Sequence, residues 1–374
     1  MRLLFFIPLL VSLLGSCIGN RAVTLSDPIS QDSIYYAKGF DISRHSEFTE
    51  VKVFDPWDNT RSLQRYLLVD RNLEQLPEGM GEGTIVRVPI KNIVIYTSVH
   101  ASIIELLEQQ DRVIGLCEVK YVDSEILKSH VESGKIADLG EATAPNIERM
   151  MDIETEAIIS SPFKDAGYGP VEKLGIPIVE GADYMENHPL GRVEWVRLYG
   201  LLVGAEQKAD SIFRTTCSEY NKLKELAANV AHRPTMIAER KYGGQWFVPS
   251  GDSYNAVMYA DAGADYIFKN ERGAGSVPLA FESVLDRGID ADLWLLKYYN
   301  TEDMRYDDLK AEYAPYANFE AFKNRNIYAC NSFRLPYYED APMHPHLILK
   351  DYISIFHPEL LTGYEQRYFM RMEE

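Results

Sequence analysis

The sequence from His188 to Val230, HPLGRVEWVRLYGLLVGAEQKADSIFRTTCSEYNKLKELAANV, predicts a long, mostly helical connector near the middle of the chain. Pro189 suits the first turn of a helix, where its missing N–H would have no partner anyway. Apolar residues then recur at helical spacing in two runs, separated by Gly204. The runs contain Val193, Val196, Leu198, Leu201 and Leu202, and then Ala209, Ile212, Phe213, Tyr220, Leu223 and Leu226. About 25 helical residues would span nearly 40 Å, about the width of a small domain.

Short apolar runs alternate with helix-like segments on both sides of this connector. The runs that we interpret as strands are 93–96, 113–119, 157–159 and 177–180 before it, and 235–240, 265–268, 291–296 and 327–329 after it. Such alternation is typical of a mainly parallel sheet. We therefore predict an α/β protein with two Rossmann-like lobes and a ligand cleft between them. The predicted N-terminal lobe is 33–188, the connector 189–230 and the C-terminal lobe 231–374.

The composition is that of a globular protein with a strong acidic excess. The 374 residues are 46% apolar and 25% charged, and the formal net charge is −18. A chain of this length suits two hydrophobic cores better than one. The negative charge argues against a nucleic-acid partner or an anionic membrane surface, because both would repel the protein.

The first residues predict a targeting segment. Arg2 is followed by the apolar run Leu3–Leu14, which is too short to span a membrane as a mature helix, and then by Gly15-Ser16-Cys17. This junction resembles a bacterial lipobox, which implies a signal peptide at 1–16, a lipid on Cys17 and a polar tether at 17–32. An ordinary secretory peptide with an incidental cysteine is the alternative. The other cysteines are three and widely spaced, which argues against a disulfide framework or a zinc site.

Several short motifs occur in a characteristic order across both lobes. They are Leu139-Gly140, Pro145–Glu148, Asp183–Arg192, Tyr242–Pro249, Ser253-Tyr254, Ala262–Tyr266, Phe281–Val284, Leu349–Tyr352 and His357–Leu360. With the lipobox and the helical connector, this order resembles the substrate-binding lipoproteins of ABC importers. The class in question captures ferric siderophores, haem or cobalamin. The sequence departs from the resemblance at His346, where this class usually has an aspartate.

The resemblance implies a function without chemistry of its own. The protein would bind an iron chelate, haem or a corrinoid as a monomer in the periplasm, and deliver it to an ABC permease and its ATPase, with no intrinsic cofactor. Glu148 and Glu282 match the positions that dock arginines of the permease in this family. Each also falls near the start of a predicted helix, where a carboxylate favours the helix dipole, so a purely structural role stays open for each.

The ligand-binding residues are expected in loops after the carboxyl ends of the strands. The set that we predict is Ser98, His100, Tyr168, Tyr184 and Met185 from the first lobe, and Arg240, Tyr242, Trp246 and Tyr254 from the second. Further candidates are Phe163, His188, Tyr298, Tyr337 and Tyr338. Aromatic side chains with a polar group suit a large, flat, partly polar chelate, and an arginine suits a carboxylate. Tyr168 and Tyr184 are predicted to face Tyr242, Trp246 and Tyr254 as an aromatic clamp.

Two alternatives to an importer component remain at this stage. One is an enzyme that acts on a tetrapyrrole or chelate, although the sequence contains no nucleophile elbow, phosphate loop or paired-carboxylate motif. The other is a surface scavenger that works without a permease. His188 could cap the connector or bind a metal, and His344-Pro345-His346 stays unassigned because no zinc-site spacing accompanies it.

Overall fold

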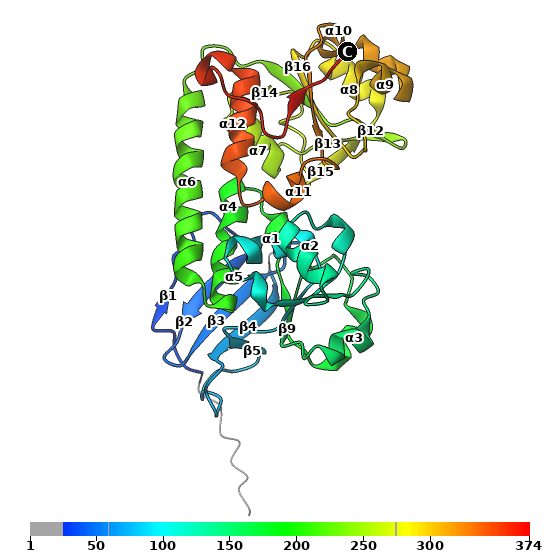
Figure 1. Ribbon diagram of the computed structural model, residues 1–374. Coiled ribbons are helices and arrows are strands. Elements are labelled where there is room, and N and C mark those ends of the chain that lie inside the picture. The colour runs from blue at the N-terminus through cyan, green and yellow to red at the C-terminus, as the bar shows by residue number, and fades with distance from the viewer. Residues whose placement is uncertain (1–24, 59, 274) are drawn as a thin grey trace, which may run out of the picture.

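The computed structural model describes residues 25–58, 60–273 and 275–374, and it consists of two α/β lobes joined along one side by helix α6 (Glu206–Ala228) (Figure 1). The predicted signal peptide and Cys17 lie outside these residues. Within them, no helix has both the length and the apolar character needed to cross a membrane.

The main sheet of the N-terminal lobe is parallel, with strand order β10-β9-β6-β7-β8. Its strands are β6 (Ile93–Ile95), β7 (Val113–Leu116), β8 (Ala137–Asp138), β9 (Ala157–Ser160) and β10 (Ile178–Glu180). The connecting helices are α1 (Ser98–Leu106), α2 (Glu125–Glu132) and α3 (Ile147–Asp152), with short 3-10 turns η1 (Gln110–Arg112), η2 (Val119–Tyr121), η3 (Gly169–Leu174) and η4 (Asp183–Met185). The central strands are apolar and buried, as expected for parallel strands that are covered on both faces.

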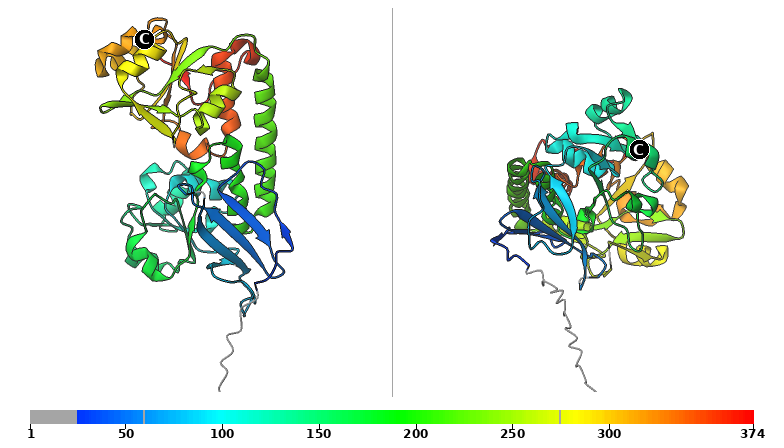
Figure 2. Two further views of the ribbon diagram at one scale, coloured as in Figure 1. Left: turned by 180° about the vertical axis from the view of Figure 1, so that it is seen from behind. Right: turned by 90° about the horizontal axis from the view of Figure 1, so that it is seen from below.

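A second, mostly antiparallel sheet precedes the parallel one. It contains β1 (Ser30–Gln31), β2 (Phe40–Arg44), β3 (Phe48–Phe54), β4 (Ser62–Asp70) and β5 (Thr84–Val88), in that order. This sheet lies beside the lower end of α6, where Arg44 pairs with Glu206 at 2.8 Å (Figure 2). Because Ser30–Gln31 pair with β2, the end of the predicted tether at 17–32 is part of the fold.

The C-terminal lobe repeats the parallel plan. Its sheet has the order β14-β11-β16-β17-β18, with β11 (Thr235–Ala238), β14 (Asp265–Tyr266), β16 (Leu293–Tyr298), β17 (Ile327–Asn331) and an antiparallel β18 (Met370–Arg371). A small antiparallel sheet adds β12 (Lys241–Tyr242), β13 (Gln245–Pro249) and β15 (Ser276–Leu279). The helices are α7 (Tyr254–Asp261), α8 (Phe281–Gly288), α9 (Tyr306–Glu312), α10 (Glu320–Lys323), α11 (Tyr337–Asp340) and α12 (Pro345–Phe356), with turns η5 (Ala314–Asn318) and η6 (Pro358–Leu361). The predicted two-lobed α/β fold is therefore confirmed.

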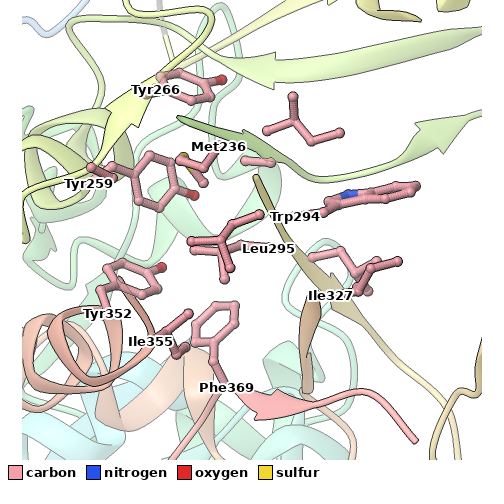
Figure 3. Packing of buried hydrophobic residues seen from close by; sticks show 14 of the residues in the cluster. Met236, Tyr259, Tyr266, Trp294, Leu295, Ile327, Tyr352, Ile355 and Phe369 are labelled. Atoms are coloured by element: carbon pink, nitrogen blue, oxygen red, sulfur yellow. The ribbon is translucent and has the colours of Figure 1, made fainter. Parts of the chain in front are cut away.

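The core of the C-terminal lobe is rich in aromatic rings. Tyr259 of α7 lies 5.3 Å from both Tyr266 and Tyr352, measured between ring centroids, and these rings cover strands β11 and β16 (Figure 3). Many of the 24 tyrosines are thus structural, and their number alone does not indicate a ligand site.

The connector consists of three helices where the sequence pattern predicted one long strut. They are α4 (Pro189–Glu194), α5 (Val196–Val203) and α6. Gly204 ends α5 with a φ of +71°, in the left-handed region that favours glycine. The chain turns there, so that α5 and α6 lie side by side (Figure 1).

Helix α6 is fixed to both lobes. Arg197 of α5 pairs with Asp210 at 3.0 Å near one end of α6. Near the other end, the Tyr220 hydroxyl and the Lys224 ammonium contact Asp261 of α7 at 2.8 and 2.9 Å. A helix held at both ends limits how far the lobes can move apart.

Two buried carboxylates bind the chain where it enters the first lobe. Glu194 is fully buried and accepts the backbone N–H groups of Tyr35–Ala37, with oxygen–nitrogen distances of 2.7–3.1 Å. Glu186 accepts the N–H groups of Lys38 and Gly39, and the indole N–H of Trp195 at 2.9 Å. A carboxylate that accepts several N–H groups satisfies donors that would otherwise be buried without a partner.

We expect Glu194→Gln to lower the free energy of unfolding by about 2–4 kcal/mol, because the amide retains one acceptor oxygen and points a donor at other donors. Chemical denaturation measures this change. Glu225→Gln is the control, since Glu225 is exposed on α6, and it should change stability by less than about 0.5 kcal/mol. Equal effects of the two substitutions would contradict the structural role of Glu194.

Candidate functional site

A cleft of about 1300 Å³ lies between the two lobes. Its N-terminal wall is formed by segments that follow the strands β6, β7 and β9, which include Tyr96–Ser98, Glu118–Asp123 and Gly167–Val171. Its C-terminal wall is formed by Tyr299 after β16, by Ser332, Phe333 and Leu335 after β17, and by α11, which contacts α1 of the other lobe. The cleft therefore lies at the carboxyl ends of both parallel sheets, where open α/β sheets bind ligands.

Exposed aromatic rings line this cleft from both lobes. They are Tyr121 and Phe163 on one side, and Tyr299, Phe333 and Tyr338 on the other, and each is at least 49% exposed. Tyr299 and Phe333 meet edge to face, with ring centroids 5.2 Å apart. Large exposed rings that gather in one concave site indicate a surface kept free for a ligand.

Some of the polar groups that line the cleft are buried, whereas Lys120 and Asp123 are exposed. Tyr96 is 2% exposed, and its hydroxyl has no hydrogen-bond partner among the described residues. Glu339 of α11 accepts the backbone N–H of Asp123 at 3.0 Å, so this hydrogen bond joins the lobes. Burial raises the pKa of Glu339 to about 7, although the hydrogen bond from Asp123 acts in the opposite direction.

Two residues of the predicted ligand set line the cleft. Ser98 begins α1, and Tyr168 lies after β9 and donates its hydroxyl hydrogen toward Glu180 at 3.1 Å. Burial raises the pKa of Tyr168 well above its usual value. Among the further candidates, Phe163, Tyr337 and Tyr338 also line the cleft.

The structure contradicts the prediction that Trp246 is a cleft residue. Its side chain is fully buried, and its indole N–H donates to the carbonyl oxygen of Ala238 at 2.9 Å. Phe281 and Trp294 pack around the ring. Trp246 lies on β13, whose inward and outward residues alternate, so the Gly-rich segment is a strand pair and not an open loop.

His100 is also displaced from the predicted site. It is 1% exposed on α1, and its Nε2 lies 3.2 Å from Oδ1 of Asp183. Arg192 and Tyr199 contact the same carboxylate at 3.2 and 3.3 Å. Burial alone would raise the pKa of Asp183, but His100 and Arg192 outweigh it and hold that pKa below its usual range. This cluster joins α1 to the connector and is structural.

The predicted ligand residues Tyr184, Met185 and Tyr254 do not line the cleft. Tyr184 donates to the Pro162 carbonyl at 2.5 Å, and Met185 follows it in η4. Tyr254 begins α7 beneath the Arg192 guanidinium. The structure therefore does not form the clamp of these tyrosines with Tyr242 and Trp246.

Arg240 and Tyr242 line a separate pocket of about 350 Å³ in the C-terminal lobe. Tyr338 lines both this side pocket and the cleft. Arg240 pairs with Glu312, and Tyr242 is 81% exposed. Tyr298 is buried and donates to Asp303 at 3.2 Å, so it too lies outside the cleft.

His188 and His344 have local structural roles. His188 caps α4, where its Nδ1 accepts the N–H of Leu190 at 3.1 Å, and burial lowers its pKa. Nδ1 of His344 lies 2.6 Å from Asp340. Across the described residues, no group of His, Cys, Asp and Glu side chains is arranged to hold a metal ion.

Glu148 and Glu282 are exposed in the first turns of α3 and α8, one on each lobe. Both helices lie on the side of the molecule away from α6 (Figures 1 and 2). Among the described residues, neither carboxylate forms an ion pair within the chain. Their placement is compatible with a contact to a single partner that spans both lobes.

Sequence reasoning missed Tyr96, Tyr121, Tyr299 and Phe333. Tyr299 directly follows β16, a strand that is buried on both faces and ends at the buried Tyr298. Phe333 comes soon after the end of β17. Tyr299 could have been found by looking for an aromatic residue directly after a buried parallel strand. Phe333 is the second residue after such a strand.

Comparison with known proteins places this chain in a family. The chain belongs to the periplasmic binding protein family, whose sequence model matches residues 93–332. Members of this family are solute-binding proteins, so the chain is a binding protein and not an enzyme. The matched segment begins after the β1–β5 sheet.

One curated relative is an uncharacterized lipoprotein of Methanocaldococcus jannaschii, 26% identical, with 94% of this chain and 89% of the relative covered. Similar solved structures include S. aureus IsdE complexed with heme (TM-score 0.55, 15% identity, 71% of this chain and 98% of that chain). Another is Helicobacter pylori CeuE with Ni(II) bound (TM-score 0.57, 14% identity, 75% and 88% covered). At these identities the structures establish a common fold.

Trp246→Ala should lower the free energy of unfolding by about 3–5 kcal/mol, because it leaves a large cavity in the core and an unpaired carbonyl. Denaturation measured by tryptophan-independent circular dichroism tests this. Tyr242→Ala, in the same hairpin but exposed, should change stability by less than about 0.5 kcal/mol. A stable Trp246→Ala protein with weakened solute binding would restore Trp246 to the ligand site.

Proposed function

We propose that this chain is the substrate-binding lipoprotein of an ABC importer, which captures an iron chelate, haem or a corrinoid and delivers it to a permease. The observation that carries the proposal is the inter-lobe cleft lined by exposed aromatic rings. Such rings offer wide apolar faces to a large, flat solute, and the tyrosines add hydroxyl groups. A volume of about 1300 Å³ is large enough for a solute of that size.

The geometry of the connector supports capture without large rearrangement. Because α6 is fixed to both lobes, the rings on the two walls are held close to their binding positions. A preformed site reduces the ordering cost of binding. Among the similar structures, IsdE is complexed with heme and CeuE has Ni(II) bound, which favours a metal complex as the solute here.

The proposal includes the site of action. The Leu14-Gly15-Ser16-Cys17 junction and the lipoprotein relative support a lipid anchor on Cys17 and a periplasmic, membrane-attached protein. We expect this protein to act as a monomer. Glu148 and Glu282 would then face the permease, one from each lobe.

Binding by the aromatic cleft is tested first by native mass spectrometry of the protein purified from its own host, which weighs a retained solute directly. Phe333→Ala should then weaken binding of that solute about thirty-fold, the effect of losing an anchor worth on the order of 2 kcal/mol. Tyr35→Ala removes an exposed ring outside the cleft and should leave the affinity unchanged. Equal affinities of wild type and Phe333→Ala, with the fold intact, would remove the cleft from the proposal.

Delivery to a permease is tested separately. The double substitution Glu148→Ala and Glu282→Ala should abolish uptake of the solute by cells while solute affinity in vitro stays within experimental error, because neither residue lines the cleft. Normal uptake by this variant would instead favour a scavenger that works without permease docking.

A further inference from the structure

The charged groups that line the cleft are mainly acidic. Glu118 and Asp123 come from the N-terminal lobe and Glu339 from the C-terminal lobe, while Lys120 and Lys128 provide the positive charges. None of the described residues that line the cleft is an arginine or a histidine. The usual bidentate receptor for a carboxylate or a catecholate is thus missing from these walls.

Both lysines are already engaged by carboxylates, most closely by ones outside the cleft, and Lys128 also lies 3.9 Å from Asp123 of the cleft wall. The Lys120 ammonium lies 2.8 Å from Glu141, and the Lys128 ammonium lies 3.1 Å from Glu125. Neither glutamate lines the cleft. An anionic solute would have to compete with these partners for either ammonium group.

Of the acidic groups in the lining, Glu118 is incompletely hydrogen-bonded among the described residues. Oε2 of Glu118 is buried without a hydrogen-bond partner among the described residues, while Oε1 accepts the N–H of Ala142 at 3.1 Å. Glu118 itself has a φ of +55°, a conformation that residues with a side chain rarely adopt. The Lys120 ammonium is 3.6 Å from Oε2, beyond hydrogen-bonding distance.

Glu339 is influenced by one cation, Lys128, and only from a distance. It is 8% exposed, and no ammonium or guanidinium group of the described residues lies within ion-pair distance. The hydroxyl of Tyr96, which has no partner among the described residues, adds a further polar group to the cleft wall. These buried oxygens can accept hydrogen bonds from a solute that carries donors.

The side pocket lined by Arg240 and Tyr242 does not supply an unpaired cation for an anionic solute. Its cations Arg240 and Lys297 are paired with Glu312 and Glu239. The third, Lys241, lies 4.4 Å from the ring centroid of Tyr313. All three are thus occupied within the lobe.

We propose that the cleft selects solutes whose periphery is uncharged or cationic and rich in hydrogen-bond donors, and that it rejects chelates with peripheral carboxylate or catecholate charge. This selectivity rests on the proposed function of the cleft as the solute site. An anion placed beside Glu118 and Glu339 meets like charge in a poorly solvated site. A cation or an amide donor meets acceptor oxygens and the faces of aromatic rings.

Three matched pairs of probes test this selectivity by titration of the purified chain at pH 7.5. They are ferrioxamine B and its N-succinyl derivative, cyanocobalamin and its monocarboxylate, and the dimethyl ester of haemin and haemin itself. Within each pair the metal complex is shared and the second member is more anionic. In every pair that binds, the less anionic member should bind at least about tenfold tighter, the size of one charge-assisted hydrogen bond.

Substitutions locate the effect. Glu118→Gln and Glu339→Gln should each reduce the affinity ratio within a pair several-fold, whereas Glu132→Gln, which removes the same charge from an exposed position on α2, should leave it unchanged. If all three substitutions change the affinity ratio equally, net charge sets the selectivity, and the proposal that Glu118 and Glu339 set it is overturned. Equal or tighter binding of the anionic members would overturn it as well, with the proposed function intact. Failure of all six probes to bind would overturn both the proposed selectivity and the proposed function.

Discussion

The separation of the two lobes is set by one helix that is bonded to each of them. Asp210 of α6 pairs with the N-terminal lobe through Arg197, and Tyr220 and Lys224 pair with the C-terminal lobe through Asp261. The helices α11 and α1 form a second contact between the lobes. The cleft is therefore bounded by two points of attachment, and its walls depend on both for their spacing.

Buried carboxylates serve two different purposes in this molecule. Glu194 and Asp183 are surrounded by donors, which makes them rigid joints between segments far apart in sequence. Glu339 is buried beside the cleft, and Glu118 lies there half-buried with one buried oxygen that no hydrogen bond satisfies among the described residues. Since incompletely satisfied buried oxygens are costly to a fold, they are expected where a ligand completes them.

The fold could be predicted from the sequence more fully than the site. Local patterns in a single sequence determine where apolar runs of strand length alternate with helical periods, and this alternation occurs on both sides of one connector.

The turn at Gly204 divides the connector, although the glycine itself is visible in the sequence. Trp246 was misplaced because a Gly-Gly pair was interpreted as an open loop, when the alternation of its neighbours indicated a strand. Which aromatic rings face each other across the cleft depends on how the lobes are set together, and no local pattern encodes that. His100 illustrates the same limit, since its partner Asp183 is 83 residues away.

The hydrogen bond from Asp123 to Glu339 has a consequence for how lobe motion can be followed. The donor is a backbone amide of one lobe, and its acceptor belongs to the other. Whenever the lobes separate, this amide loses its acceptor and its proton becomes exchangeable with solvent. A single amide proton thus acts as a gauge of the opening of the cleft, independent of any solute and of any engineered label.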